Sequence, residues 1–266
     1  MARGSLRRPA LLLTFDDGLR NNADVVAPIL RKCHIPAVFF ISSRHCEPGK
    51  YLWFMYLKML RLYFAGSGVT LDGTYIPLDG CRRENGIQEV TRRLLELKPH
   101  PRAMYDAIAS QLPPLEEFVP SSVLADECYG MTTEQVHDLG NDPLFTVGAH
   151  TIDHPYLSRC NAQEAWRQVS ENKLWLEQVT GAKCDLFAYP LGDLDNNIVE
   201  QCARLKFQRA FATEWSHIRH SQLAIRRVGI YRSAMTLLRI KIQCGHWLPV
   251  RLIQTARTFV RALRAV

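Results

Sequence analysis

The sequence contains no CxxC pair, although it has eight cysteines. Zinc knuckles and fingers need closely paired cysteine or histidine ligands, and disulfide scaffolds are short and dense in cysteine. A chain of 266 residues with dispersed cysteines is typical of neither class. We therefore expect reduced thiols in the core, at Cys33, Cys46, Cys81, Cys128, Cys160, Cys184, Cys202 and Cys244.

The sequence also lacks a long uncharged apolar run. A helix that crosses a bilayer needs about 20 predominantly apolar residues, and no segment of the chain supplies them. The N-terminus is basic, but the apolar stretch from Pro9 to Phe15 is too short for a signal sequence followed by a cleavage site. The expected location is cytoplasmic.

Acidic residues are fewer than basic ones, 26 against 33, which gives a formal net charge of +7. This excess suits anionic partners such as phosphate-linked sugars, acidic glycans or a membrane surface. Nucleic acid is not expected, because the sequence has neither zinc-finger spacing nor an aromatic RNA-binding motif. The length and the 47% hydrophobic content allow a sizeable core, in one α/β barrel or in two small domains.

An apolar run from Leu11 to Phe15 ends abruptly in Asp16, Asp17 and Gly18. This pattern is typical of a buried strand whose carboxyl end opens into a site. Side chains alternate on extended backbone, so the two aspartates should do different jobs, one binding a cation and the other handling a proton. The alternative is an ordinary polar turn, because Asp-Gly is a common turn dipeptide.

A second strand-like stretch, residues 144–149, is followed by His150 and His154. Pro155 disfavours a helix at His154, and no glutamate follows His150, so the pair does not match the zinc-protease helix. An aspartate with two histidines leaves positions of a Zn²⁺-type ion open for water and substrate, as in catalytic metal sites. Two ordinary surface histidines are the alternative interpretation.

Three motifs together resemble those of a known family. They are Thr14-Phe15-Asp16-Asp17-Gly18, the pair His150 and His154, and Phe187-Ala188-Tyr189-Pro190-Leu191-Gly192. In order and spacing they resemble the first three motifs of the polysaccharide deacetylases, the NodB-homology or carbohydrate esterase family 4 proteins. The form Phe-x-Tyr-Pro-x-Gly resembles the exopolysaccharide-type subgroup. The resemblance covers residues 10–40 and 130–230 and leaves the middle of the chain unexplained.

The resemblance implies a role for each motif. It implies that Asp17, His150 and His154 hold a divalent metal, with Zn²⁺ first and Co²⁺, Ni²⁺ or Mn²⁺ as alternatives. It also implies that Asp16 is the general base that activates the metal-bound water. Substrate and oxyanion would be bound at Tyr189, Pro190, Leu191 and Gly192. The implied reaction removes the N-acetyl group from an amino sugar of an N-acetylated glycan, a glycan precursor or a lipid-linked sugar.

The chain departs from the better-known members of that family at three points. Ala188 stands where those members have an arginine that orients the base, and Leu191 stands where they have a tyrosine. Their late general-acid histidine has no counterpart in residues 223–230. His217 and His220 are the candidates to replace it.

Two other functions remain open at this stage. The first is a non-catalytic, metal-containing glycan-binding protein of the same fold, which would bind metal and sugar without turnover. The second is an iron oxygenase with two histidines and one carboxylate, which is disfavoured because its ligands usually lie on a β jelly roll.

The alternation of strands and helices, with every motif at the carboxyl end of a strand, predicts an α/β fold. With about six strands, we expect an irregular or incomplete (β/α) barrel of the NodB-homology type, built from residues 1–44 and 131–245. Residues 45–130 would form a mainly helical insertion near the barrel mouth. Its aromatic residues could line a substrate groove, but a stripe that faces a core is the more common use of such residues and is favoured here.

Residues 246–266 carry arginines beside an apolar stripe and predict a basic amphipathic C-terminal helix. Such a helix would dock on the barrel or lie on an anionic membrane. In the second case the protein would be peripheral at the inner membrane face.

Overall fold

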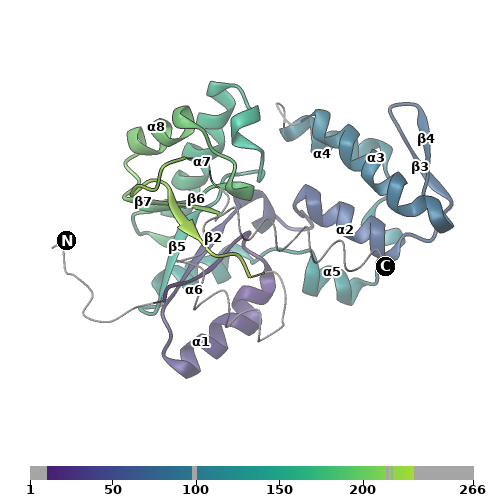
Figure 1. The fold of residues 1–266 in the computed structure, drawn as a ribbon. Coiled ribbons are helices and arrows are strands. Elements are labelled where there is room, and N and C mark those ends of the chain that lie inside the picture. The colour runs from purple at the N-terminus through teal and green to yellow at the C-terminus, as the bar shows by residue number, and fades with distance from the viewer. Residues whose placement is uncertain (1–10, 98–100, 214–215, 217, 231–266) are drawn as a thin grey trace, which may run out of the picture.

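The computed structural model describes residues 11–97, 101–213, 216 and 218–230. At its centre is a sheet of six parallel strands in the order β1-β2-β5-β6-β7-β8 (Figure 1). They are β1 (Leu13–Phe15), β2 (Ala37–Ile41), β5 (Phe145–Ala149), β6 (Leu186–Ala188), β7 (Arg209–Thr213) and β8 (Ile225–Arg227). The sheet curls into a half-barrel, which confirms the expected incomplete (β/α) barrel.

Four helices cover the outer face of this sheet: α1 (Ala27–Cys33), α6 (Thr133–Asn141), α7 (Ala162–Thr180) and α8 (Asn196–Arg204). Alternation along the strands decides which side chains meet them. In β2, Phe39 and Ile41 pack in the cluster shared with the helices. Val38 and Phe40 belong to a second, smaller cluster with Phe211 of β7, on the inner face of the half-barrel. Both faces of the curled sheet are therefore apolar: the outer face packs against helices, and the inner face packs within the half-barrel.

Helix ends follow local signals that the sequence contains. Thr132 accepts from the backbone of Gln135 in a reciprocal capping box at the start of α6. The side chain of Asn161 caps α7, and Gly181 ends that helix in the left-handed conformation. The first helix is irregular, as Pro28 predicts: a π-helical turn, Asn22–Val26, precedes α1.

One local expectation at the start of the chain is wrong. Strand β1 spans Leu13–Phe15, and the preceding Leu11 and Leu12 are exposed. Val25 and Ile29, in the first helical segment, are exposed as well. A run of apolar residues predicts burial only where another element is present to cover it.

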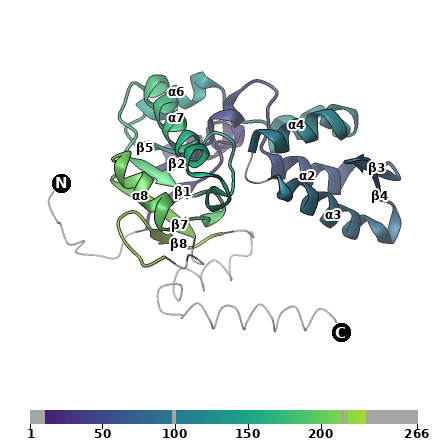
Figure 2. The same ribbon diagram turned by 90° about the horizontal axis from the view of Figure 1, so that it is seen from above.

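Residues 45–130, which lie between β2 and β5 in the sequence, are referred to as the insertion. It contains α2 (Trp53–Tyr63), the hairpin β3 (Gly68–Leu71) and β4 (Thr74–Pro77), α3 (Arg83–Glu96), α4 (Pro101–Gln111) and α5 (Ser121–Glu127). The turn at Asp72-Gly73, where both residues have a positive φ, joins the two strands of the hairpin. The insertion lies beside the sheet (Figure 2). It has its own hydrophobic cluster, in which Trp53 and Tyr56 are buried and most of the other aromatic residues of the insertion pack against it while partly exposed.

Short 3₁₀ turns complete the described elements. They are Ser43–Cys46, Gly80–Arg82, Leu115–Glu117, Leu157–Arg159 and Pro190–Gly192. No described helix is long and apolar enough to cross a bilayer. The expected C-terminal helix, residues 246–266, lies outside the described residues.

The described cysteines are all free thiols, as expected. Four of them are buried: Cys46, Cys128, Cys184 and Cys202. Cys33 and Cys81 are exposed, so the expectation of a core position is wrong for these two. Cys244 lies outside the described residues.

We predict that Gly192→Ala destabilises the fold more than Gly73→Ala. Both glycines have a positive φ, +68° and +70°, so alanine costs roughly 1–2 kcal/mol at either position. A Cβ at Gly192 would also lie 2.3 Å from Oγ1 of Thr213, whereas nothing lies within 4 Å of a Cβ at Gly73. Overpacking should add about 1–3 kcal/mol at Gly192. Urea unfolding measures both variants, and equal losses would contradict the close approach of this turn to β7.

Candidate metal centre

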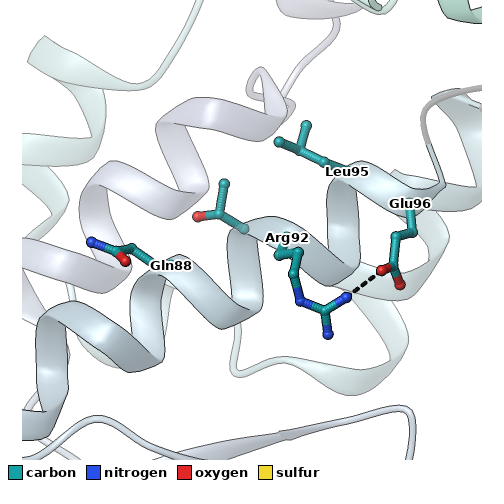
Figure 3. Close-up of a pocket in the computed structure, with 5 residues that line it drawn as sticks. Gln88, Arg92, Leu95 and Glu96 are labelled. Atoms are coloured by element: carbon teal, nitrogen blue, oxygen red, sulfur yellow. Dashed lines mark hydrogen bonds and ion pairs between the residues drawn. The ribbon is translucent and has the colours of Figure 1, made fainter.

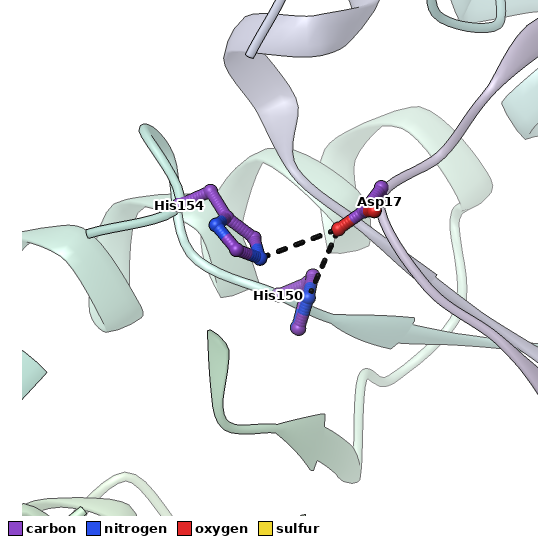
Figure 4. Close-up of side chains that lie close together, drawn as sticks. All are labelled: Asp17, His150 and His154. Carbon is purple, nitrogen blue, oxygen red and sulfur yellow. Dashed lines mark ion pairs between the residues drawn. The ribbon is translucent and has the colours of Figure 1, made fainter. Parts of the chain in front are cut away.

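Three side chains from distant parts of the sequence converge at one edge of the sheet. Asp17, His150 and His154 each offer a ligand atom within 4.8 Å of the others. The Nε2 atoms of His150 and of His154 each lie 3.3 Å from Oδ1 of Asp17 (Figure 4). The sequence predicts this grouping, and the structure brings the three residues together.

Parallel strands explain why they meet. Strands β1 and β5 both pair with β2, so their carboxyl ends lie at the same edge of the sheet. Phe145 and Ala149 of β5 pack on the helix side. His150 continues this strand, with its N–H donating to the Ile41 carbonyl, so alternation turns its side chain inward.

Left-handed backbone shapes both ligand loops. Asp17, Thr151 and His154 have φ values of 76°, 68° and 52°, which are uncommon for residues other than glycine. Such strained residues persist only where surrounding contacts hold them, and they cluster at functional sites. Oγ1 of Thr151 provides one such contact by accepting from the backbone N–H of His154 at 3.1 Å.

The turn at Asp17 separates the two adjacent aspartates. We expected extended backbone to send Asp16 and Asp17 to opposite sides, and their side chains do have different partners. The reason is different, because the chain leaves the extended conformation at Asp17. Gly18 follows with φ +78°, and a Cβ there would lie 2.9 Å from Cγ2 of Ile41. The Asp-Gly dipeptide is therefore a tight turn that also carries a ligand.

Hydrogen bonds set which ring atoms face the centre. Nδ1 of His150 lies 2.7 Å from the Ala188 carbonyl, so Nε2 is the ring nitrogen that faces Asp17. Nδ1 of His154 is buried without a hydrogen-bond partner among the described residues, and its Nε2 also faces Asp17. One carboxylate oxygen and two imidazole nitrogens thus converge, and this donor set fits a divalent cation.

The electrostatics of the cluster favour a charged aspartate. Burial by itself would raise the pKa of Asp17, but the hydrogen bond to His150 and the charges of His154 and His150 outweigh it and lower the pKa to about 2. Burial lowers the pKa of His154 to about 4. At neutral pH the cluster therefore holds an ionised carboxylate and a neutral His154, the protonation states that metal ligands need.

The pKa of His150 shifts in the opposite direction to that of His154. Burial would lower the pKa of His150, but the hydrogen bond to Asp17 and the charges of Asp16 and Asp17 raise it.

The loop between the two histidines rests on a buried polar network. The carboxylate of Asp153 is paired with Arg44 and accepts from Nε2 of Gln168 at 2.6 Å. Oε1 of Gln168 accepts in return from the backbone N–H of Asp153 at 2.9 Å. Neither partner was expected from the sequence, because each lies more than ten residues from Asp153 and belongs to no motif.

The insertion contacts both loops that carry candidate ligands. Nε1 of Trp53 donates to the His154 carbonyl at 3.0 Å, and the Phe54 ring lies 4.9 Å from the His154 ring. His45 lies between two backbone carbonyls, with Nδ1 3.0 Å from that of Asp17 and Nε2 2.6 Å from that of Cys128. These contacts fix the backbone that positions Asp17 and His154.

Asp16 lies outside the three-residue cluster and is paired with an arginine. Nη1 of Arg227 is 2.7 Å from Oδ1 of Asp16, and Nη2 is 2.7 Å from Oδ2. Sequence reasoning missed Arg227, because it lies 211 residues from Asp16 and its strand carries no recognised motif. The only sign in the sequence is a pair of adjacent arginines, Arg226 and Arg227, within the predicted strand of residues 223–230.

The third motif forms a turn at the end of β6. The Tyr189 ring is buried, and its hydroxyl donates to the Leu223 carbonyl at 2.7 Å. Pro190 is also buried, whereas Leu191 is 45% exposed and has φ 58°. The N–H groups of Gly192 and Asp193 are bonded within the turn, while that of Leu191 has no backbone acceptor among the described residues.

Only one of the two candidate acids is among the described residues. His217 lies outside the described residues. His220 is exposed, in the segment that joins β7 to β8.

A hollow on the insertion is unrelated to these residues. It is lined by Gln88, Thr91, Arg92, Leu95 and Glu96, all on one face of α3 (Figure 3). An ion pair joins Arg92 to Glu96 across it. Because a single helix lines the hollow, no groups from different elements converge there.

We predict that Asp17→Asn abolishes stoichiometric binding of Zn²⁺ or Co²⁺, whereas Asp16→Asn retains it. The two changes are chemically identical and adjacent, but only Asp17 shares the cluster with the histidines. Metal analysis after dialysis gives the stoichiometry, and the visible bands of Co²⁺ report its coordination. Equal loss in both variants, or none in Asp17→Asn, would contradict the ligand set.

Comparison with known proteins identifies the family. The sequence matches the family model for polysaccharide deacetylase over residues 3–61 and 103–210. The fold is similar to a de-N-acetylase from Aggregatibacter actinomycetemcomitans, with TM-score 0.53, 13% identity, and 89% of this chain and 76% of that chain covered.

It is also similar to the deacetylase PplD of Streptococcus pyogenes, solved with acetate, with TM-score 0.50, 14% identity, and coverage of 86% and 68%. At such identities these structures support the fold alone. No curated protein shows significant sequence similarity to the chain. Because the family model spans more than half of the sequence, the protein belongs to the polysaccharide deacetylase family.

Proposed function

We propose that this protein is a metal-dependent carbohydrate N-deacetylase that hydrolyses the acetamide of an N-acetylated amino sugar. One observation carries the proposal. In a member of the polysaccharide deacetylase family, Asp17, His150 and His154 converge beside a second carboxylate, Asp16, that is not one of them. A metal site beside a carboxylate that does not ligate the metal is an arrangement suited to hydrolysis of an amide.

The proposed ligands are Nε2 of His150, Nε2 of His154 and a carboxylate oxygen of Asp17. Three protein ligands leave positions open for water and substrate. The same donor set accepts Zn²⁺, our first choice, and also Co²⁺, Ni²⁺ or Mn²⁺. When bound, the cation would lower the pKa of a water molecule and polarise the amide carbonyl.

Asp16 is the proposed general base. Its side chain is 32% exposed, so solvent reaches it. The pairing with Arg227 occupies one lone pair on each carboxylate oxygen and leaves another on each. Asp16 can therefore accept the proton of the attacking water while Arg227 holds the plane of its carboxylate.

The turn after β6 is the proposed oxyanion site. The N–H of Leu191 is free of backbone acceptors among the described residues, and a donor held in place stabilises the charge that develops on the carbonyl oxygen. Tyr189, Pro190 and Gly192 would hold this turn in shape, since Tyr189 and Pro190 are buried and Gly192 packs against Thr213.

The leaving amine needs a proton, which we assign to His217 or His220. Both belong to the segment that follows Thr213, the last residue of β7, and so begins at the edge of the sheet where Asp17 lies. Hydrolysis then yields acetate and the free amino sugar.

The proposed substrate is an N-acetylated glycan or a lipid-linked sugar of the kind handled by exopolysaccharide-type members. The net charge of +7 suits a substrate that carries phosphate or carboxylate groups. The insertion would border the substrate, because Phe54 packs on His154.

We predict acetate release by the Zn²⁺- or Co²⁺-loaded protein from at least one member of a panel of N-acetylated glycans and lipid-linked sugars. Asp16→Asn should lower kcat by about 10²- to 10⁴-fold, the usual contribution of a general base, with metal still bound. His150→Ala should lose both metal and activity. Enzymatic acetate assay and metal analysis check the three proteins in parallel.

Other outcomes would contradict this proposal in different ways. Bound metal and bound glycan without acetate release would favour a non-catalytic glycan-binding protein. Full activity in Asp16→Asn would contradict its role as base.

A further inference from the structure

We propose that Arg227 is a positioning residue that holds the Asp16 carboxylate in its reactive orientation, so that the last strand of the sheet completes the site. This inference rests on the proposed deacetylase function. It deepens that function by assigning a role to a residue outside the three sequence motifs.

The contact between Arg227 and Asp16 fixes the orientation of the carboxylate plane as well as the distance between the two side chains. Two N–H···O contacts of 2.7 Å, one to each oxygen of Asp16, form a bidentate pair. Nη1 also donates to Oγ1 of Thr14 at 2.9 Å. Thr14 lies two residues before Asp16, so the guanidinium is tied to the same strand as the carboxylate that it orients.

The Arg227 side chain reaches from one end of the sheet to the other. Strands β1 and β8 are at opposite ends of the strand order, and neither pairs with the other among the described strands. Arg227 on β8 nevertheless contacts Thr14 of β1 and Asp16 just after it. One side chain therefore bridges the two edges of the half-barrel, across the seam that the backbone leaves open.

The surroundings restrict the guanidinium to this geometry. Its Cζ lies 5.3 Å from the ring centre of Phe40 and 5.9 Å from that of Phe211, and the side chain is 17% exposed. Burying a cation beside aromatic rings is costly without a partner, so the ion pair to Asp16 compensates for the lost hydration. The same burial leaves Asp16 little freedom to rotate.

Ala188, at the end of β6, cannot orient the Asp16 carboxylate, because its methyl side chain has no hydrogen-bond donor. Its carbonyl is already engaged with Nδ1 of His150. The end of β6 thus supports the metal side of the site, and the end of β8 supports the side of the base.

The neighbouring residue provides a matched control. Arg226 is on the same strand, but its side chain donates to the Ile218 carbonyl at 3.2 Å. Arg226→Ala therefore removes an arginine of equal charge without touching Asp16.

The experiment compares Arg227→Ala, Arg227→Lys and Arg226→Ala by metal content and by kcat and KM for glycan deacetylation. We expect Arg227→Ala to keep its metal and its KM and to lose about 100-fold in kcat, as expected for a misplaced catalytic group. Added guanidinium ion should restore part of this kcat. Arg227→Lys should stay impaired, because an ammonium cannot form the bidentate contact. Arg226→Ala should behave as wild type.

A second comparison separates positioning from general stability. In an Asp16→Asn background, Arg227→Ala should cause no further loss of kcat, because the group that it positions is already inactive. A further loss of similar size would show that Arg227 acts elsewhere and would overturn the proposal.

The remaining outcomes are also decisive. With an active wild type, unchanged kcat in Arg227→Ala would overturn the positioning role and leave the deacetylase function standing. An inactive wild type would overturn both. If Arg227→Ala fails to fold, the kcat and metal content of Arg227→Lys decide the question. A reduced kcat with metal bound supports the proposal, and a wild-type kcat overturns it.

Discussion

Two adjacent carboxylates must be kept apart in this protein, and the site depends on how that separation is achieved. Asp16 and Asp17 would repel each other if they shared one environment. The left-handed turn at Asp17 sends its carboxylate to two histidines, while Asp16 meets an arginine. Each negative charge thus has its own positively charged or proton-donating partner, and one dipeptide can serve two purposes.

Each half of the site is supported by a different part of the chain. The cluster of Asp17, His150 and His154 rests on the insertion and on α7: Trp53 holds the His154 backbone, and Gln168 holds Asp153. Asp16 is held by β8, through Arg227. These supports are hydrogen bonds to backbone and carboxylate groups, which orient ligands more firmly than apolar contacts do.

The half-barrel suits such a site because it is open. A closed barrel would pair β1 with the last strand and fill the interior with side chains. Here the inner apolar cluster is small, with Phe40 and Phe211 at its centre, and an arginine bridges the seam. The carboxyl edge of the sheet can therefore present polar groups to a substrate.

By itself, the sequence determined the parts that depend on local patterns. Local patterns predicted the alternation of strands and helices, the strand-like stretch that forms β5, and a mainly helical insertion. The capping residues of α6 and α7 are also local signals of the sequence. The polar residues that follow two strands predicted a cluster of one aspartate with His150 and His154, and the family resemblance singled out Asp17 as that aspartate. They meet because parallel strands bring their carboxyl ends together.

Only the tertiary structure decided the partners of those residues. Arg227, Arg44 and Gln168 contact site loops from 211, 109 and 15 residues away, and no local pattern distinguishes them from surface polar residues. The same limit explains the exposed Cys33 and Leu12, whose burial depended on what would cover them. Strand alternation, turns and caps depend on neighbouring residues, so the sequence shows them directly. Burial and charge pairing depend on which distant segments pack against a residue, so only the folded structure shows them.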